Sequence, residues 1–157
     1  MEPFRLLTAG QRDDRDETTA AHQTANKALV RRFVEDVLNR GEVGLLDELV
    51  ADDHIDHGPL GNHCGLESIR RDLLTCRAGF PDLTFEIVEL VAEGDRVARR
   101  FVATGTHLGN YLGAPPTGRP VRVTGLAIDR IAAGKLAETW SNLDLFGLLR
   151  QIGAIER

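Results

Sequence analysis

Residues 120–143 read PVRVTGLAIDRIAAGKLAETWSNL, and two alternating runs within this stretch decide the fold. Apolar and polar side chains alternate along each run, which is the two-residue period of a strand with one buried face. The tripeptide Ala132-Ala133-Gly134 separates the runs, so we expect two antiparallel strands joined by a tight turn. At roughly 10–13 residues by pattern, these strands exceed the usual ~5–6, and long strands in a small sheet twist and curl.

The segments on either side add further strands and several helices. Leu83, Phe85 and Ile87 alternate with polar residues, and a turn signal at 93–95 precedes another strand at 96–107. Residues 25–41, 43–50, 65–80 and 145–152 have helical apolar spacing, with Gly41 as a C-terminal stop. Helices followed by antiparallel strands are typical of an α+β fold, here a curved antiparallel sheet wrapped around the N-terminal helices, with a cavity between them.

The domain organisation follows from length and composition. A chain of 157 residues can build one core of ordinary size, and we predict a single domain over residues 25–157. Residues 1–24 alternate acidic and basic side chains after a very short apolar patch, without the apolar core of a secretory signal. We expect this leader to be disordered or fraying.

Charge and cysteine content exclude several classes of function. The net charge of −5 disfavours a nucleic-acid partner or an anionic membrane surface, and no apolar run approaches the ~20 residues of a membrane span. The two cysteines, Cys64 and Cys76, form neither a metal-type pair nor a disulfide framework. We therefore expect a reduced, cytoplasmic protein with no nucleic-acid and no membrane partner.

Three motifs, GTHLGNYLGAPPTGRPV, RIAAGKLAETW and LDLFGLLRQIG, together resemble the SnoaL-like polyketide cyclase family. The segment ALVRRFVEDVLNRGEVGLLDELVADDHIDH is similar to that family's opening helices, so the resemblance covers roughly residues 27–153. It implies the cone-shaped α+β barrel of the nuclear-transport-factor-2-like superfamily. It also implies an activity without metal or organic cofactor, as in the family's best-known members.

The resemblance implies an activity as well. The best-known members close a ring in anthracycline precursors by an intramolecular aldol reaction, using an aspartate on the last strand and a histidine on the strand before it. Those positions fall at Ser141 and Ala127, so neither group is kept. A serine hydroxyl without an adjacent base is too weakly acidic to ionise at neutral pH. It therefore cannot take a carbon-bound proton.

The sequence therefore favours an altered activity. We expect a cofactor-free tailoring enzyme acting on an aromatic, anthracycline-type polyketide intermediate, closer to the family's hydroxylase-like members than to its aldol cyclases. A polyketide ester cyclase and a non-catalytic small-molecule-binding member of the fold are the alternatives. Each of them takes a hydrophobic aromatic small molecule into a mostly apolar pocket.

The strand phase assigns faces to the two final strands. If Ser141 faces the cavity, then Thr139 and Leu143 do too, and the preceding strand turns Val121, Val123, Gly125 and Ala127 inward. A bulge at Gly125 would reverse this assignment. The outer face would carry Leu126, Ile128 and Trp140, an apolar surface that we expect to pair two subunits into a homodimer.

Three residues are the catalytic candidates: His57, Ser141 and Asp144. Asp144 precedes the closing helix, where helix N-capping is the favoured role. His54 or His57 at the cavity edge is the candidate replacement base, since an imidazole pKa of about 6.5 suits proton transfer. Simple exposure or hydrogen bonding in a loop is the alternative for both. The run DDHIDHGPLGNHC matches no established zinc spacing, so we expect no metal site.

The remaining candidates would bind the ligand. They are His54, Arg100, Phe101, His107, Ala127, Thr139 and Leu143. Arg99 and Arg100 are adjacent on a strand, so one of them faces inward, and the pattern does not decide which arginine this is. An inward arginine needs a carboxylate partner. For His107, anchoring of the loop LGNYLGAPPTG is favoured over contact with the ligand. That loop is either a lid over the cavity or a rigid connection. Asp56, Asp129 and Asp144 are the acids near the expected pocket.

Overall fold

The computed structural model describes residues 9–155, with side chains from residue 17 onward. Its helices are α1 (Ala9–Arg32), the π-helical η1 (Phe33–Asn39), η2 (Val43–Leu45), α2 (Leu46–Leu49), α3 (Leu66–Gly79) and α4 (Leu145–Ile152). Its strands are β1 (Val50–Gly58), β2 (Gly61–Cys64), β3 (Thr84–Glu93), β4 (Arg96–Thr106), β5 (Pro120–Ala132) and β6 (Lys135–Leu143). Both long-strand predictions, the turn between them and the closing helix are confirmed.

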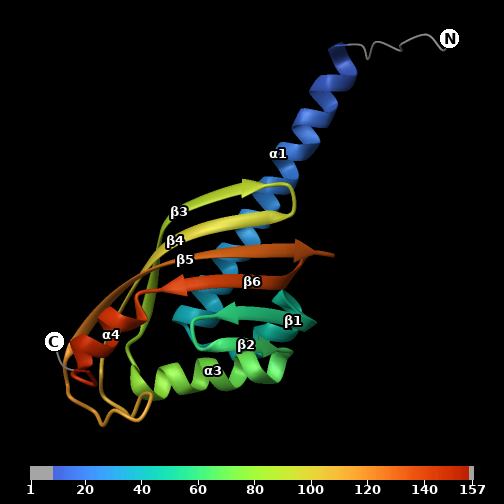
Figure 1. Ribbon diagram of the computed structural model, residues 1–157. Helices are drawn as coiled ribbons and strands as arrows, with labels where there is room; N and C mark the ends of the chain where they lie inside the picture. The colour runs from blue at the N-terminus through green and yellow to red at the C-terminus, as the bar shows by residue number, and fades with distance from the viewer. Residues whose placement is uncertain (1–8, 156–157) are drawn as a thin grey trace.

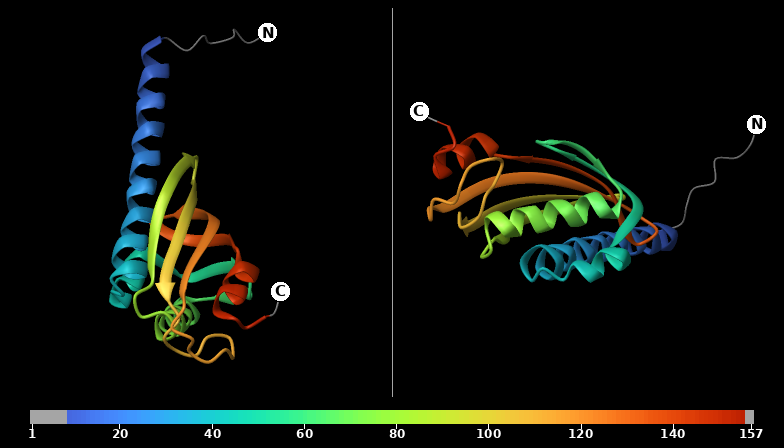
Figure 2. Two further views of the ribbon diagram at one scale, coloured as in Figure 1. Left: turned by 90° about the vertical axis from the view of Figure 1, so that its left-hand side faces the viewer. Right: turned by 90° about the horizontal axis from the view of Figure 1, so that it is seen from below.

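The described strands form one curved sheet in the order β2-β1-β6-β5-β4-β3 (Figure 1). Figure 2 shows α1 and α3 on the same side of this sheet, where α1 packs against β3 and β4, and α3 against β1 and β2. The predicted α+β class and the curved sheet around N-terminal helices are confirmed. The sheet is mixed, however, because β1 runs parallel to β6 while the other neighbours are antiparallel.

The core lies between the helices and the concave face of the sheet. Val30, Val34 and Val37 project from the first helical segment onto Val97 of β4 and Leu136 of β6, and all of these side chains are buried. A second apolar cluster under α4 includes Phe80, Val121 and Ile152. Phe33, Val50 and Leu136 of the first cluster also line the main cavity of the fold.

Glycine permits two local features that position the sheet. The turn between β5 and β6 has positive φ at Ala133 and Gly134, the conformation that a two-residue hairpin turn requires. β5 pairs through Gly125 without a register shift, and a Cβ built at this glycine would lie 2.3 Å from Cζ of Phe101. The register change falls instead between Arg130 and Ile131. The predicted inward phase of β5 is therefore confirmed, and its glycine makes room for an aromatic ring.

The first helix is longer than the sequence pattern indicated. Residues 1–8 of the predicted leader lie outside the described residues, whereas residues 9–24 belong to α1, so the helix does not begin at the predicted boundary. No glycine or proline occurs between Gln11 and Arg40, and helix-compatible residues fill the interval. Residues 17–22 are exposed, so backbone propensity extends the helix there without packing against the sheet. Among the described residues, no helix is both long and apolar enough to cross a membrane.

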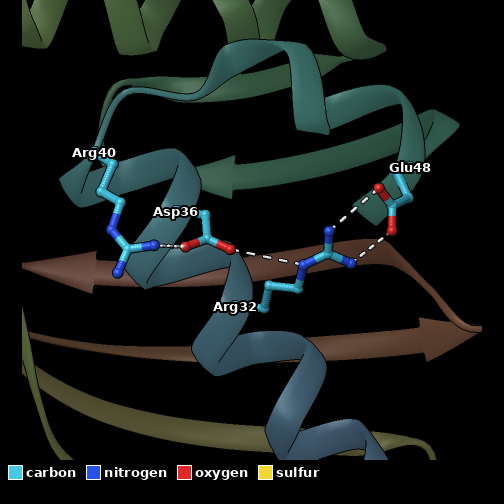
Figure 3. Close-up of polar contacts among 4 residues, drawn as sticks. All are labelled: Arg32, Asp36, Arg40 and Glu48. Atoms are coloured by element: carbon cyan, nitrogen blue, oxygen red, sulfur yellow. Dashed lines mark hydrogen bonds and ion pairs between the residues drawn. The ribbon is translucent and has the colours of Figure 1, made fainter.

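A surface ion-pair chain ties the end of α1 to the next helix (Figure 3). Arg32 contacts Asp36 through Nε at 3.6 Å and Glu48 through Nη1 at 2.5 Å, and Arg40 contacts Asp36 at 2.6 Å. Exposed pairs of this kind contribute little to stability, because water and salt screen them. These ion pairs connect the end of α1 to α2, which leads into β1, and Val50, His54 and Asp56 of that strand line the cavity.

Candidate functional site

A cavity of about 180 Å³ lies between the concave face of the sheet and the helices. Its walls include the aromatic side chains of Phe33, Phe85 and Phe101. A second hollow of about 200 Å³ shares Asp56, Ser141 and three other lining residues with it and extends toward β2 and the loop around Tyr111. An apolar hollow of about 80 Å³ continues under α4. Together they make an elongated, mostly apolar space suited to a flat organic molecule.

Strand β6 faces this space as the sequence pattern predicted. Thr139, Ser141 and Leu143 line the cavity. Ala127 of β5 is the cross-strand neighbour of Ser141 and is buried beside it. The two positions at which the resemblance places an aspartate and a histidine are therefore adjacent on the concave face, with a hydroxyl and a methyl group in their place.

The cavity does contain an acid, and it comes from β1. Asp56 lines both larger hollows, and its Oδ1 is buried with no hydrogen-bond partner among the described residues. A Cβ built at Gly58 would lie 3.6 Å from Ser141 Oγ and 3.9 Å from Asp56 Oδ2, so the hydroxyl and the carboxyl both lie beside this glycine. Burial raises the pKa of the Asp56 carboxyl. A carboxyl that is more easily protonated than usual can both accept and return a proton.

A chain of buried polar side chains crosses the floor of the cavity. Arg99 of β4 contacts Asp129 of β5, with Nε 2.8 Å from Oδ2 and Nη2 donating to Oδ1 at 3.4 Å. Thr139 donates its hydroxyl to Asp129 Oδ1 at 2.8 Å, and His54 Nε2 lies 3.1 Å from the same hydroxyl. All four residues are at least nine-tenths buried. The row links β4, β5, β6 and β1.

The number of hydrogen-bond donors in this row of polar side chains determines the tautomer of His54. A carboxylate beside a guanidinium only accepts hydrogen bonds, so the single Thr139 proton is used toward Asp129. The Thr139 oxygen must then accept from His54, which puts the imidazole proton on Nε2. Burial lowers the pKa of His54 and so favours the neutral ring. Its Nδ1 is left as a lone-pair acceptor, buried and unpartnered among the described residues.

Two candidates predicted for the cavity lie elsewhere because of strand alternation. His57 is on the outer face, where its ring stacks on Trp140 at 5.3 Å and its Nε2 lies 2.9 Å from Glu138. The Glu138 hydrogen bond raises the His57 pKa. Arg100 also faces outward and pairs with Glu89. His57 as a cavity base and Arg100 as a ligand-binding residue are therefore wrong, and His54 and Arg99 occupy those inward positions.

Two further candidates have structural roles. Asp144 accepts a hydrogen bond from the Gly147 amide at 2.8 Å and so caps α4, which confirms the favoured alternative to catalysis. His107 is fully buried and its Nδ1 lies 3.0 Å from the Thr117 hydroxyl, across the loop that follows β4. It lines none of the three hollows, so loop anchoring describes it and ligand binding does not.

Sequence reasoning missed the polar side chains at the opposite wall. Asp72 of α3 lines both larger hollows and is hydrogen-bonded to His63 Nδ1. His63 is the cross-strand partner of Asp56 on the β1–β2 ladder, so this pair extends the polar row toward the surface. The run at residues 52–64 thus divides between the two faces of the sheet. Among the described residues no group of three metal-ligating side chains gathers there.

Signals for some of these placements are present in the sequence. Arg99 shares its strand face with Val97 and Phe101, two apolar residues that must be inside, so that phase identifies Arg99 as the inward arginine. The proximity of Asp56 and Ser141 has no comparable signal. It depends on parallel pairing of β1 with β6, strands far apart in the chain.

Comparisons with known proteins agree with this architecture. The nogalonic acid methyl ester cyclase of Streptomyces nogalater is 30% identical over 118 residues, covering 73% of this chain and 88% of the relative. The structure of AclR from Streptomyces galilaeus, a proposed hydroxylase, superimposes with a TM-score of 0.77 at 27% identity, covering 85% of this chain and 99% of AclR. The structure of IdmH from Streptomyces antibioticus, a proposed polyketide cyclase, gives a TM-score of 0.73 at 32% identity, covering 82% and 98%.

A family model settles the relationship. The model described as SnoaL-like polyketide cyclase matches residues 28–152, which include the described sheet, its cavity and the helices that cover it. The match begins inside α1 and ends at the last residue of α4. The chain belongs to the SnoaL-like polyketide cyclase family.

Proposed function

We propose that this protein is a polyketide tailoring enzyme that moves a proton at a carbon next to a carbonyl group of an aromatic polyketide intermediate. The observation that carries the proposal is Asp56, a buried carboxyl of raised pKa that, like the Ser141 hydroxyl, lies beside Gly58. Asp56 supplies the acid–base group that the side chains of Ser141 and Ala127 lack. The activity named for the Streptomyces nogalater relative supports the substrate class.

Intramolecular ring closure is the reaction that this chemistry supports best. The Asp56 carboxylate removes a proton from the carbon beside a carbonyl, and the resulting enolate carbon attacks a second carbonyl of the same molecule. One carbon–carbon bond forms, and the new alkoxide takes the proton back from Asp56. The step neither oxidises nor reduces the substrate. General acid–base assistance of this kind contributes about 10²–10⁴-fold in rate.

The shape of the cavity supports an aromatic substrate. Phe33, Phe85 and Phe101 give flat apolar walls, and the hollow near Ser141 opens toward Tyr111 and Leu112. A polycyclic molecule larger than the main cavity can extend into this second hollow. Apart from Asp72 and Cys76 of α3, the polar side chains that line the cavity project from the sheet. They can orient a carbonyl-bearing edge while the rings remain in apolar surroundings.

A hydroxylase-like activity is the second candidate. Ser141 and Ala127 replace both groups that the ring-closing mechanism is expected to use, and the chain is similar to AclR over nearly its whole described length. Such a reaction inserts one atom of O₂ into the substrate and reduces the other to water, so it requires air and two electrons from a reductant or from a reduced form of the substrate. The two candidates therefore differ in the mass of the product.

Mass spectrometry of the product tests the proposal. Purified protein is mixed with nogalonic acid methyl ester in air and under nitrogen, beside Asp56→Asn and Ser141→Asp variants. A product of unchanged mass with a new ring, formed in both atmospheres and lost in Asp56→Asn, is expected. A gain of one oxygen only in air would establish the second candidate instead. Ring closure by Ser141→Asp alone would mean that the native protein binds the substrate without converting it.

A further inference from the structure

Arg99 has hydrogen-bond donors that its ion pair does not use. Nη2 donates to Asp129, whereas Nε lies 2.8 Å from Asp129 Oδ2 without forming a hydrogen bond among the described residues. Nη1 makes no hydrogen bond with any residue in the described part of the chain, yet it is not among the polar atoms that are both buried and unpartnered. Because Arg99 lines the cavity, this nitrogen offers an accessible N–H donor there.

The guanidinium is held by its ion pair with Asp129 and by two aromatic rings. The rings of Phe33 and Phe101 lie 5.9 and 5.8 Å from its central carbon. Asp129 is itself held by the Thr139 hydroxyl, and Thr139 by His54. A donor fixed in this way needs no reorganisation when charge develops on a nearby oxygen, which is the condition for effective electrostatic stabilisation.

The charge balance of the site indicates what it binds. Arg99 and Asp129 are together neutral, and Asp56 and Asp72 face the same cavity. These carboxyl groups disfavour a fully charged ligand carboxylate. A neutral carbonyl oxygen, which carries only partial negative charge, meets no such repulsion and can still accept a strong hydrogen bond from a cation.

We infer that Arg99 Nη1 is the oxygen-binding donor of the cavity, taking the carbonyl oxygen of an aromatic ketone lodged between Phe33 and Phe101. During proton transfer the same contact stabilises the enolate oxygen, so Arg99 acts in the proposed reaction as an oxyanion-binding group. The ketone-binding step needs no turnover. It can be tested, and can hold, whether or not ring closure is the activity.

Binding of a small aromatic ketone tests this assignment. The affinity of 1-acetylnaphthalene is compared with that of 1-ethylnaphthalene, which lacks the carbonyl, in wild type and in Arg99→Gln/Asp129→Asn. The double variant replaces the ion pair by two amides and so avoids leaving a buried carboxylate unpaired. Arg100→Gln, the outward neighbour, is the matched control. The double variant is expected to lose at least about tenfold in affinity for the ketone and little for 1-ethylnaphthalene.

An isotope-edited infrared spectrum of the bound, carbonyl-labelled ketone gives an independent readout if the double variant fails to fold. The carbonyl stretch is expected below its frequency in water, unchanged in Arg100→Gln and still low in Asp56→Ala, which removes the neighbouring carboxyl. A frequency at the value for an aprotic solvent, or one that rises in Asp56→Ala, overturns the assignment. The assignment is also overturned if the double variant loses affinity equally for both probes, if it loses affinity for neither probe, or if the wild type binds neither probe.

Discussion

At the scale of single residues, the cavity answers a question that strand β6 raises by itself. Its alternation puts Thr139 and Ser141 inside, and the family resemblance implies that Ser141 stands where an aspartate is expected. Both placements are confirmed. The acid near Ser141 is Asp56 of β1. No local pattern predicts this proximity, because only the pairing of β1 with β6 brings the two residues together.

The tautomer of His54 is the first prediction at this scale. Nitrogen-15 NMR of the imidazole should show the proton on Nε2 and a bare Nδ1 at neutral pH. Thr139→Ser, which keeps the hydroxyl, should retain this tautomer, whereas Thr139→Val should lose it because Nε2–H no longer has its acceptor. A wild-type ring with its proton on Nδ1 would contradict the donor order from Arg99 to His54.

Asp56 gives a prediction of pH-dependent stability. Its pKa is raised in the folded state from the ordinary value of 3.8, so the folded protein binds the extra proton between the unfolded and folded pKa values. Stability should therefore fall as pH rises through that window, and the penalty is absent below it. Urea unfolding across pH should show Asp56→Asn becoming more stable relative to wild type as pH increases. A difference that stays constant with pH would show that burial does not shift this carboxyl.

At the scale of elements, the long strands and their turns follow from pattern, while the edge of the sheet does not. The turn at Ala133-Gly134 and the length of β5 are visible in the alternation and in a single glycine. The segment that forms β1 and β2 mixes histidines, acids and glycines without a clear period. Its strand geometry comes from pairing with β6, which is a tertiary effect.

Gly125 yields the prediction for this scale. Its backbone sits under the Phe101 ring, so a methyl group there would collide with the ring and push it into the cavity. Gly125→Ala should cost about 1–3 kcal/mol in the free energy of unfolding, the usual range for overpacking a core. Thr124→Ala, at the exposed neighbouring position, should cost clearly less. Chemical denaturation of both variants decides this, and equal costs would remove the steric role assigned to Gly125.

At the scale of the molecule, hydrophobic periodicity and element order sufficed for the α+β class and for a cavity beneath a curved sheet. They placed the helix boundary wrongly, because the exposed residues of α1 carry no packing pattern. They also left the arginine phase undecided, although Val97 and Phe101 on the same face as Arg99 determine it. Hydrophobic periodicity is a local pattern, so it predicts neither the long-range pairing of strands nor the partners of buried polar groups.

The outer sheet face carries the prediction for the assembled protein. Leu126 and Ile128 are 59% and 43% exposed on the outer face of β5, and we propose that a second copy covers them. Sedimentation should show a dimer for wild type and a monomer for Leu126→Lys/Ile128→Lys, since two buried charges would oppose pairing. Leu74→Lys on α3, equally apolar and exposed, should leave the dimer intact. Monomeric wild type would refute the pairing.

The most direct test of the central claim measures the first proton transfer alone. Exchange of the substrate's carbon-bound hydrogen beside the carbonyl for solvent deuterium is followed by mass spectrometry, using nogalonic acid methyl ester. Asp56→Asn should slow this exchange by about 10²–10⁴-fold, while Asp53→Asn, an exposed carboxylate on the same strand, should not. Exchange that survives in Asp56→Asn would contradict the account, because the acid found beside Ser141 would then not be the group that moves the proton.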